Sequence, residues 1–184
     1  MTPVELARTI AGGPIVQICW QVDDIATAVD RWVRATGAGP FFLAGHIAFD
    51  ELTYRGRPAT LDQSSAIGQR GGLQVELFHQ HCGSPSGAVE TASADGSPSL
   101  QHVTWFAADV AAEGRRLAAL GFDEVMTARL PAMGGMRIAW YDARSLLGCM
   151  VEVYEEHPTM RRLYRKVAAA AEGWDGSDPL RPLG

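Results

Sequence analysis

The fold is decided by the stretch Gln17-Ile18-Cys19-Trp20-Gln21-Val22-Asp23-Asp24-Ile25, because it occurs twice. The second copy begins 85 residues later and reads His102-Val103-Thr104-Trp105-Phe106-Ala107-Ala108-Asp109-Val110, in the same register and without a gap. Each copy opens with a polar residue that can bind a metal, continues as an apolar strand and passes through an aspartate into a helical pattern. Two copies are too few for a solenoid, so the repeat predicts a domain built from two paired modules.

Both modules are expected to have the same order of secondary structure. In the first module the patterns predict a strand at 15–22, a helix from 25 to 35, and strands near 41–43, 59–69 and 73–79. In the second they predict a strand at 101–107, a helix at 109–120, and strands at 123–130, 136–142 and 147–154. Each module is therefore βαβββ, and the fold class is α+β. A lone module would expose one face of its sheet, so the two modules must pair to close a core.

Composition divides the chain into five parts. We expect a short N-terminal arm at 1–13, the first module at 14–81, a linker at 82–99, the second module at 100–157, and a C-terminal helix with a tail at 158–184. Gly, Ser, Pro and Ala dominate the linker, which is typical of a flexible connection.

The bulk composition favours a cytoplasmic protein with a substantial core. Hydrophobic residues make up 47% of the chain and charged residues 20%. The net charge is −5, and basic residues cluster only around Arg161, Arg162, Arg165 and Lys166, which argues against nucleic-acid and membrane partners. No apolar run approaches the roughly 20 residues of a membrane helix, and the N-terminus lacks the pattern of a signal peptide.

The three cysteines are odd in number and widely spaced. Cys19 and Cys149 lie within apolar strand patterns, so we interpret them as buried free thiols rather than as members of a disulfide or a zinc site.

Four polar residues at equivalent positions of the repeat suggest a shared metal site. Gln17 and His102 open the first strand of each module, and Glu76 and Glu152 each lie four residues after a glycine in the last strand. If these strands are neighbours, each module contributes two ligands and the approximate twofold symmetry brings all four together. One imidazole, two carboxylates and an amide oxygen suit Zn, Ni, Co, Mn or Fe with water in open positions.

The repeat, the βαβββ order and these four positions resemble the vicinal oxygen chelate superfamily over about residues 14–156. That group includes glyoxalase I, methylmalonyl-CoA epimerase, extradiol dioxygenases and bleomycin-resistance proteins. The resemblance implies a half-barrel built from two paired modules and a divalent metal ion held by Gln17, Glu76, His102 and Glu152. This order of ligands looks like glyoxalase I, as does Glu76-Leu77-Phe78-His79.

Two positions depart from glyoxalase I. Gln21 stands where that family carries an arginine for glutathione, and Gln80 stands where it carries an asparagine. Other segments, such as Gly39-Pro40-Phe41-Phe42, look more like relatives of methylmalonyl-CoA epimerase. That family has a His and then a Gln at its first two ligand positions, whereas this chain has Gln17 and Glu76.

The resemblance implies an enzyme that acts on a small carbonyl or thioester substrate. The metal would stabilise the enediolate that forms when an adjacent C–H loses its proton, with Glu76 or Glu152 as the catalytic base. We expect an isomerase or epimerase first and a glyoxalase-type lyase second. A metal-free binding protein of the bleomycin-resistance type is the alternative, and an extradiol dioxygenase is the third, since only His102 supplies an imidazole.

Further residues are candidates for the walls of a site. Phe41, Trp105 and Trp140 are expected to contact the substrate, although core packing explains them equally well. His79 and His81 alternate along one strand, which we interpret as rim histidines because a zinc site there lacks partners. His46 lies in a variable segment that is expected to roof the cavity.

The C-terminal helix predicts an assembly. It carries an apolar stripe, and related proteins commonly form dimers, so we expect a homodimer with this helix and Trp174 near the interface. The alternative is that the stripe covers its own chain's sheet. The stripe consists of Met160, Leu163, Tyr164, Val167 and Ala171.

Overall fold

The computed structural model describes residues 12–184, so most of the expected N-terminal arm lies outside the described residues. The helices are α2 (Ile25–Thr36), α3 (Gly87–Thr91), α4 (Val110–Ala119), α5 (Arg144–Leu147) and α6 (Pro158–Ala171), with a 3-10 turn at Pro131–Met133. The strands are β1 (Gln17–Gln21), β2 (Phe41–Ala44), β3 (Asp50–Tyr54), β4 (Arg57–Pro58), β5 (Gln63–Arg70), β6 (Leu73–Gln80), β7 (Ser99–Ala107), β8 (Glu124–Leu130), β9 (Met136–Asp142), β10 (Met150–Glu155) and β11 (Leu180–Pro182). None of the helices among these residues is long and apolar enough to cross a membrane.

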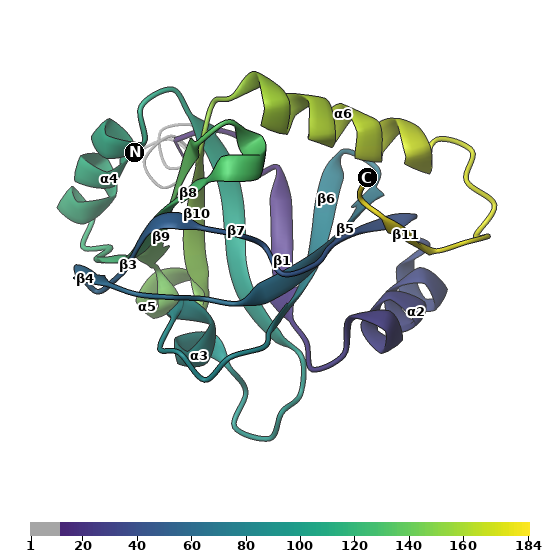
Figure 1. Ribbon diagram of the computed structural model, residues 1–184, viewed down its shortest axis with the longest axis horizontal. Coiled ribbons are helices and arrows are strands. Elements are labelled where there is room, and N and C mark those ends of the chain that lie inside the picture. Colours follow the sequence, from purple (N-terminus) through teal and green to yellow (C-terminus); the bar gives the residue numbers. More distant parts are fainter. Residues whose placement is uncertain (1–11) are drawn as a thin grey trace.

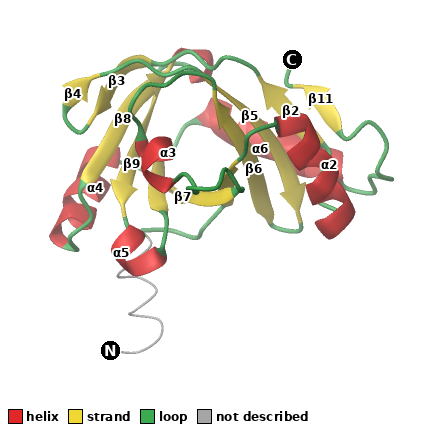
Figure 2. Ribbon diagram, turned by 90° about the horizontal axis from the view of Figure 1, so that it is seen from below, coloured by secondary structure: helices red, strands yellow, loops and turns green. Residues whose placement is uncertain are grey.

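All the described strands join one curved, unclosed sheet (Figures 1 and 2). Its order is β11-β2-β5-β6-β1-β7-β10-β9-β8-β3-β4. The expected α+β class and half-barrel are therefore confirmed. The opening strands of the two copies, β1 and β7, pair antiparallel at its centre, so the two halves pair within one chain.

The aspartates of the repeat start the two helices that cover the outside of the sheet. Asp24 accepts a hydrogen bond from Thr27 N at 2.7 Å, and Asp109 accepts one from Ala112 N at 3.0 Å. Such caps satisfy backbone donors that the first turn of a helix leaves free. In Figure 2, α2 and α4 lie toward opposite ends of the arch, outside it.

The segment after β2 crosses from one half of the sheet to the other. β3 pairs with β8 at the edge of the second half, although it belongs to the first half by sequence. Residues 45–49, here called the strap, lie between β2 and β3 and line the central cavity, as expected of a roof. Ile47 N donates to Gln63 O at 2.8 Å and so ties the strap to β5.

The expected flexible linker holds a short helix. Ser86 caps α3 by accepting from Ala88 N and Val89 N, and Ala88 is buried beside Cys19 and Phe78. Ser86 Oγ also donates to Gln80 Oε1 at 2.6 Å. These contacts fix the connection against the end of β6 despite its turn-rich composition.

The apolar stripe of α6 is covered by its own chain. Met160, Leu163 and Val167 are buried in the main core cluster, and α6 packs on β5. The ring of Trp174 packs against Gly39 of the same chain. The alternative, that the stripe covers the sheet of its own chain, is therefore confirmed, and the position of α6 and Trp174 near a dimer interface stays a prediction. The homodimer itself stays a prediction.

An ion cluster fastens α3 to the second half. Glu90 pairs with Arg55 and Arg144 at 2.7 Å each, and Asp142 pairs with Arg144 at 2.6 Å. Burial alone would raise the pKa of Glu90, but hydrogen bonds from Arg55 and Tyr54 outweigh it, and the pKa lies below its ordinary value. The carboxylate form of Glu90 therefore stabilises the folded chain.

Replacing Glu90 with glutamine is expected to lower the free energy of unfolding at neutral pH by about 1–3 kcal/mol. A carboxyl whose pKa is lowered by folding stabilises above its unfolded pKa of about 4.3 and loses this contribution as the pH falls below that value. The difference between parent and variant should thus be full above about pH 5 and shrink below about pH 4. Urea unfolding at several pH values measures it. Glu156→Gln, which removes an exposed pair with Arg161, is the control and should change little.

Candidate metal centre

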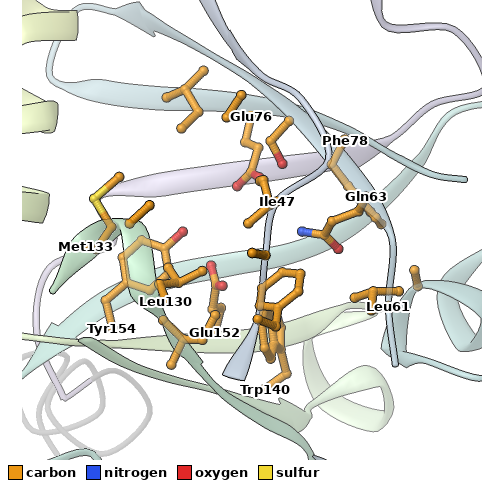
Figure 3. A pocket seen from close by; sticks show the side chains of 18 of the residues that line it. Ile47, Leu61, Gln63, Glu76, Phe78, Leu130, Met133, Trp140, Glu152 and Tyr154 are labelled. Carbon is orange, nitrogen blue, oxygen red and sulfur yellow. The ribbon is translucent and has the colours of Figure 1, made fainter. Parts of the chain in front are cut away.

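A cavity of about 360 Å³ opens on the concave side of the sheet. Strands β5 to β10 supply its floor and walls, the strap crosses it, and Met160 and Leu163 of α6 close one side. Glu76, His102 and Glu152 lie among its lining residues. In Figure 3 the carboxylates of Glu76 and Glu152 point toward the same space, beside Trp140 and Tyr154.

The structure brings together the four residues that the repeat singled out. His102 Nε2 lies 3.0 Å from Glu152 Oε2 and 3.7 Å from Glu76 Oε2. Gln17 is fully buried, and its Oε1 lies 3.2 Å from Thr104 Oγ1, which in turn lies 3.0 Å from Glu152 Oε2. The pairing explains this convergence, because β6 and β7 flank β1, and β10 follows β7.

A bulge in β7 prepares His102 as a ligand. Cys19 pairs with His102 but Trp20 pairs with Leu100, so Gln101 is an extra residue, and both Gln101 and His102 line the cavity. Gln101 Oε1 contacts His102 Nδ1 and can only accept, so Nδ1 carries the proton in this contact. In the neutral ring Nε2 then carries a lone pair, and it faces the carboxylates of Glu76 and Glu152.

Burial and charge act against each other within this group. Burial raises the pKa of Glu152, although His102 opposes the shift. Burial lowers the pKa of His102, but Cys19 and Glu152 outweigh it, and the pKa lies well above its ordinary value. Burial, together with Glu152 and Glu76, raises the pKa of Tyr154, so its hydroxyl keeps the proton that it donates to Gln17 Oε1 at 3.4 Å.

The donor atoms present fit a divalent cation. Among the described residues, Glu76 Oε2 is buried without a hydrogen-bond partner, and so is His102 Nε2 when the ring is neutral, with Glu152 Oε2 at 3.0 Å. A buried polar atom left unpaired costs about 1–3 kcal/mol, and more when it is charged. One imidazole nitrogen with carboxylate and amide oxygens is a set that Zn, Ni, Co, Mn or Fe accepts. A cation among these atoms would satisfy both unpaired groups at once.

Cys19 is part of this neighbourhood, which the sequence analysis did not anticipate. Its Sγ and ligand atoms of Glu76 and His102 all lie within 4.8 Å of one another. Burial and the charge of Glu76 raise the pKa of the Cys19 thiol to about 12, which favours the neutral thiol. The available signal was the strand period, because Cys19 follows Gln17 by two residues and so shares its face. The expectation of buried free thiols holds for Cys19 and Cys149.

Only one of the three expected substrate-binding aromatics lines the cavity. Trp140 does, whereas Phe41 is buried in the cluster around α2 and Trp105 in the cluster around α4. Strand alternation is the reason for Trp105, since it follows Thr104 and therefore points to the opposite face. Phe41 and Trp105 are core residues, so this part of the expectation is corrected.

The histidines at the rim anchor the strap. His46 Nδ1 lies 2.8 Å from Asp62 Oδ1, and His81 Nε2 lies 2.8 Å from Ser64 Oγ, which also accepts from His46 N. His46, Asp62 and His81 form a second group of possible metal ligands, at the protein surface. Their hydrogen bonds to one another and to Ser64 agree with the interpretation of rim residues.

A family model described as the glyoxalase/bleomycin resistance protein/dioxygenase superfamily matches residues 16–140. The chain belongs to this superfamily. The suspected vicinal oxygen chelate relationship is thereby confirmed, and the match includes Gln17, Glu76 and His102. Among curated proteins, none matches the chain.

Several solved structures share the fold at low sequence identity. Methylmalonyl-CoA epimerase from Mycobacterium tuberculosis is 16% identical, with a TM-score of 0.51 over 80% of this chain and 91% of that one. A hypothetical protein from Bacillus halodurans C-125 is 16% identical, with a TM-score of 0.51 over 78% and 94%. A methylmalonyl-CoA epimerase in complex with methylmalonyl-CoA and NH4+ is 15% identical, with a TM-score of 0.52 over 79% and 95%. At these identities the likeness concerns the fold alone.

Proposed function

We propose that the protein is a metal-dependent enzyme of this superfamily that moves a proton on a small carbonyl or thioester substrate. The reaction class is isomerase or epimerase first and glyoxalase-type lyase second. One observation carries the proposal: Glu76, His102 and Glu152 converge at the polar end of a substrate-sized cavity, with two of their buried donor atoms unpaired. Gln17 completes the proposed ligand set.

A divalent cation held by Gln17, Glu76, His102 and Glu152 would supply Lewis-acid chemistry, stabilising the negative charge of an enediolate. The side chains around the cation would position the ligands and exclude water. Gln101 contacts the ring of His102, and Thr104 Oγ1 lies within hydrogen-bonding distance of Glu152 and Gln17 and can donate its one proton to either. The apolar walls exclude water from the reacting end.

Glu76 is the better candidate for the base that takes the proton from carbon. Its Oε2 has no hydrogen-bond partner and faces the cavity, whereas Glu152 Oε2 accepts from Thr104 and lies beside His102. A carboxylate free of donors is easier to move from a ligand position toward a substrate C–H. Glu152 would then remain in place as a ligand.

Hydrogen exchange at carbon tests this proposal directly. Metal-loaded protein in D2O would be incubated with methylmalonyl-CoA, the hemithioacetal of methylglyoxal and glutathione, and neutral α-hydroxy ketones. We expect deuterium to enter the carbon next to the carbonyl of at least one probe. Chelation and Glu76→Gln should each abolish the exchange, while Glu113→Gln, outside the cavity, should keep it. Exchange that survives both chelation and Glu76→Gln would contradict the mechanism.

The second candidate is metal-free sequestration of an apolar ligand, as in bleomycin-resistance proteins. The apolar character of most of the cavity lining favours it. Calorimetry separates the two functions: a ligand whose affinity is unchanged by EDTA, together with a chain that retains no metal, would support sequestration and contradict the enzyme.

A further inference from the structure

The cavity lining divides into a small polar end and a much larger apolar part. Glu76, Glu152, His102 and Gln101 form one polar end, and the polar residues His46, Gln63, Ser65 and Ser86 also line the cavity. Elsewhere the walls consist of aromatic, aliphatic and thioether side chains, among them Phe78, Met126, Leu130, Ile138 and Trp140. A ligand that fills this space therefore meets carboxylates at one end and mainly apolar side chains elsewhere.

Positive charge is missing from the described part of the lining. Among the lining residues within 12–184 there is no arginine or lysine. Four arginines are adjacent in sequence to lining residues: Arg129, Arg137, Arg161 and Arg162. Of these, Arg129 pairs with Glu51 at 2.9 Å and Arg161 pairs with Glu156. Arg161 also stacks over Phe106, with its guanidinium carbon 3.7 Å from the ring centre.

The carboxylates of Glu76 and Glu152 line the cavity together with His102, and the proposed cation would offset their charge. A phosphate or carboxylate group in the apolar part of the cavity would find no arginine or lysine among the described lining residues. Burying an ionised group without a partner costs far more than burying a neutral group. Burial of apolar surface, in contrast, contributes about 25 cal/mol for each Å² removed from water.

We propose that the natural substrate is a neutral carbonyl compound with an aromatic or alicyclic body, bearing its oxygens at one end. The assignment of the oxygen-bearing end to the residues Glu76, His102 and Glu152 rests on the proposed function. The apolar body lies between Trp140, Ile138 and the strap. Anionic conjugates such as CoA thioesters and glutathione adducts are disfavoured.

The strap takes part in this selection. Ile47 and Phe49 line the cavity from the strap, so the roof as well as the floor is apolar. Ile47 is only partly buried, which makes it a position where a charge can be placed without disrupting the core.

Calorimetric titration of the full chain with defined probes tests the inference. The neutral probes are acetophenone, 2-hydroxyacetophenone and benzoin, and the anionic probes are S-lactoylglutathione and methylmalonyl-CoA. We expect the best neutral probe to bind at least about tenfold more tightly than either anionic one, a difference of about 1.4 kcal/mol or more. Tighter binding of an anionic probe, or no binding of any neutral probe at millimolar concentration, would overturn it.

A charge placed in the strap gives a second readout. Ile47→Lys should weaken the binding of the best neutral probe and strengthen that of S-lactoylglutathione. The ratio of the two affinities should therefore fall or reverse. Leu146→Lys, at an exposed position in α5, is the matched control and should leave the preference unchanged. An Ile47→Lys variant that folds normally and keeps the parent's preference would count against the inference. All titrations are run with and without metal. If the protein prefers neutral probes but catalyses no hydrogen exchange at carbon, the proposed reaction is wrong while the inference about the substrate class stands.

Discussion

Replacing Glu152 with glutamine is expected to weaken metal binding by more than about 100-fold, since even residues that only support metal ligands typically contribute 10–100-fold. The same change should raise the stability of the metal-free chain by about 1–3 kcal/mol, because it removes one of two buried carboxylates that share a single histidine. Glu76 remains to pair with His102. Metal titration and thermal unfolding after chelation measure the two effects.

Glu113→Gln is the matched control for this result. Glu113 is also largely buried, but it accepts from Trp105 Nε1 at 2.8 Å and pairs with Arg116 at 2.6 Å, outside the cavity. The change should therefore lower stability and leave metal binding intact. If Glu152→Gln also destabilised the metal-free chain, the Glu152 carboxylate would stabilise the fold. That result would contradict the claim that this carboxylate binds a metal at a cost in stability.

Replacing Trp105 with alanine is expected to lower the free energy of unfolding by about 3–5 kcal/mol, as for other fully buried aromatic residues. Trp105 is 1% exposed and packs with Leu117, Val151 and Val153 beneath α4. It does not line the cavity, so folded Trp105→Ala protein should bind metal and ligand as the parent does. Urea unfolding measures the free energy of unfolding, and calorimetry on the same preparation measures the affinities for metal and ligand.

Trp140 gives the opposite pattern and serves as the comparison. Its ring lines the cavity, so Trp140→Ala should weaken binding of an apolar ligand in addition to any loss of stability. If Trp105→Ala fails to fold, Trp105→Phe keeps most of the ring and loses the bond to Glu113. A loss of ligand affinity in folded Trp105→Phe equal to that of Trp140→Phe would show that Trp105 contacts the ligand after all.

Local patterns were sufficient for the core of the fold and for the convergence of the four residues that are proposed as ligands. The gap-free repeat fixed the positions of β1 and β7, and both helix-capping aspartates act as their positions indicated. Symmetry brought equivalent residues of the paired modules together: Glu76, His102 and Glu152 line the cavity, and Gln17 is buried next to Thr104. This inference needed only the strand period and the assumption that the modules pair.

Features that depend on distant pairing escaped the sequence analysis. Nothing local in Asp50–Tyr54 indicates that it joins the far edge of the sheet by pairing with β8. The bulge at Gln101 breaks the period of two, so the contact between Gln101 and His102 was not foreseen. Helical periodicity identified the apolar face of α6 but not what covers it, and here the cover is the chain's own core.

The most direct test of the account is X-ray absorption spectroscopy of the protein loaded with one equivalent of zinc or nickel. We predict a first shell of nitrogen and oxygen only, with a single imidazole, as Gln17, Glu76, His102 and Glu152 require. A sulfur ligand would show that Cys19 has displaced this set. Two or more imidazoles would place the metal at the surface group of His46 and His81, and either result would contradict the proposed centre.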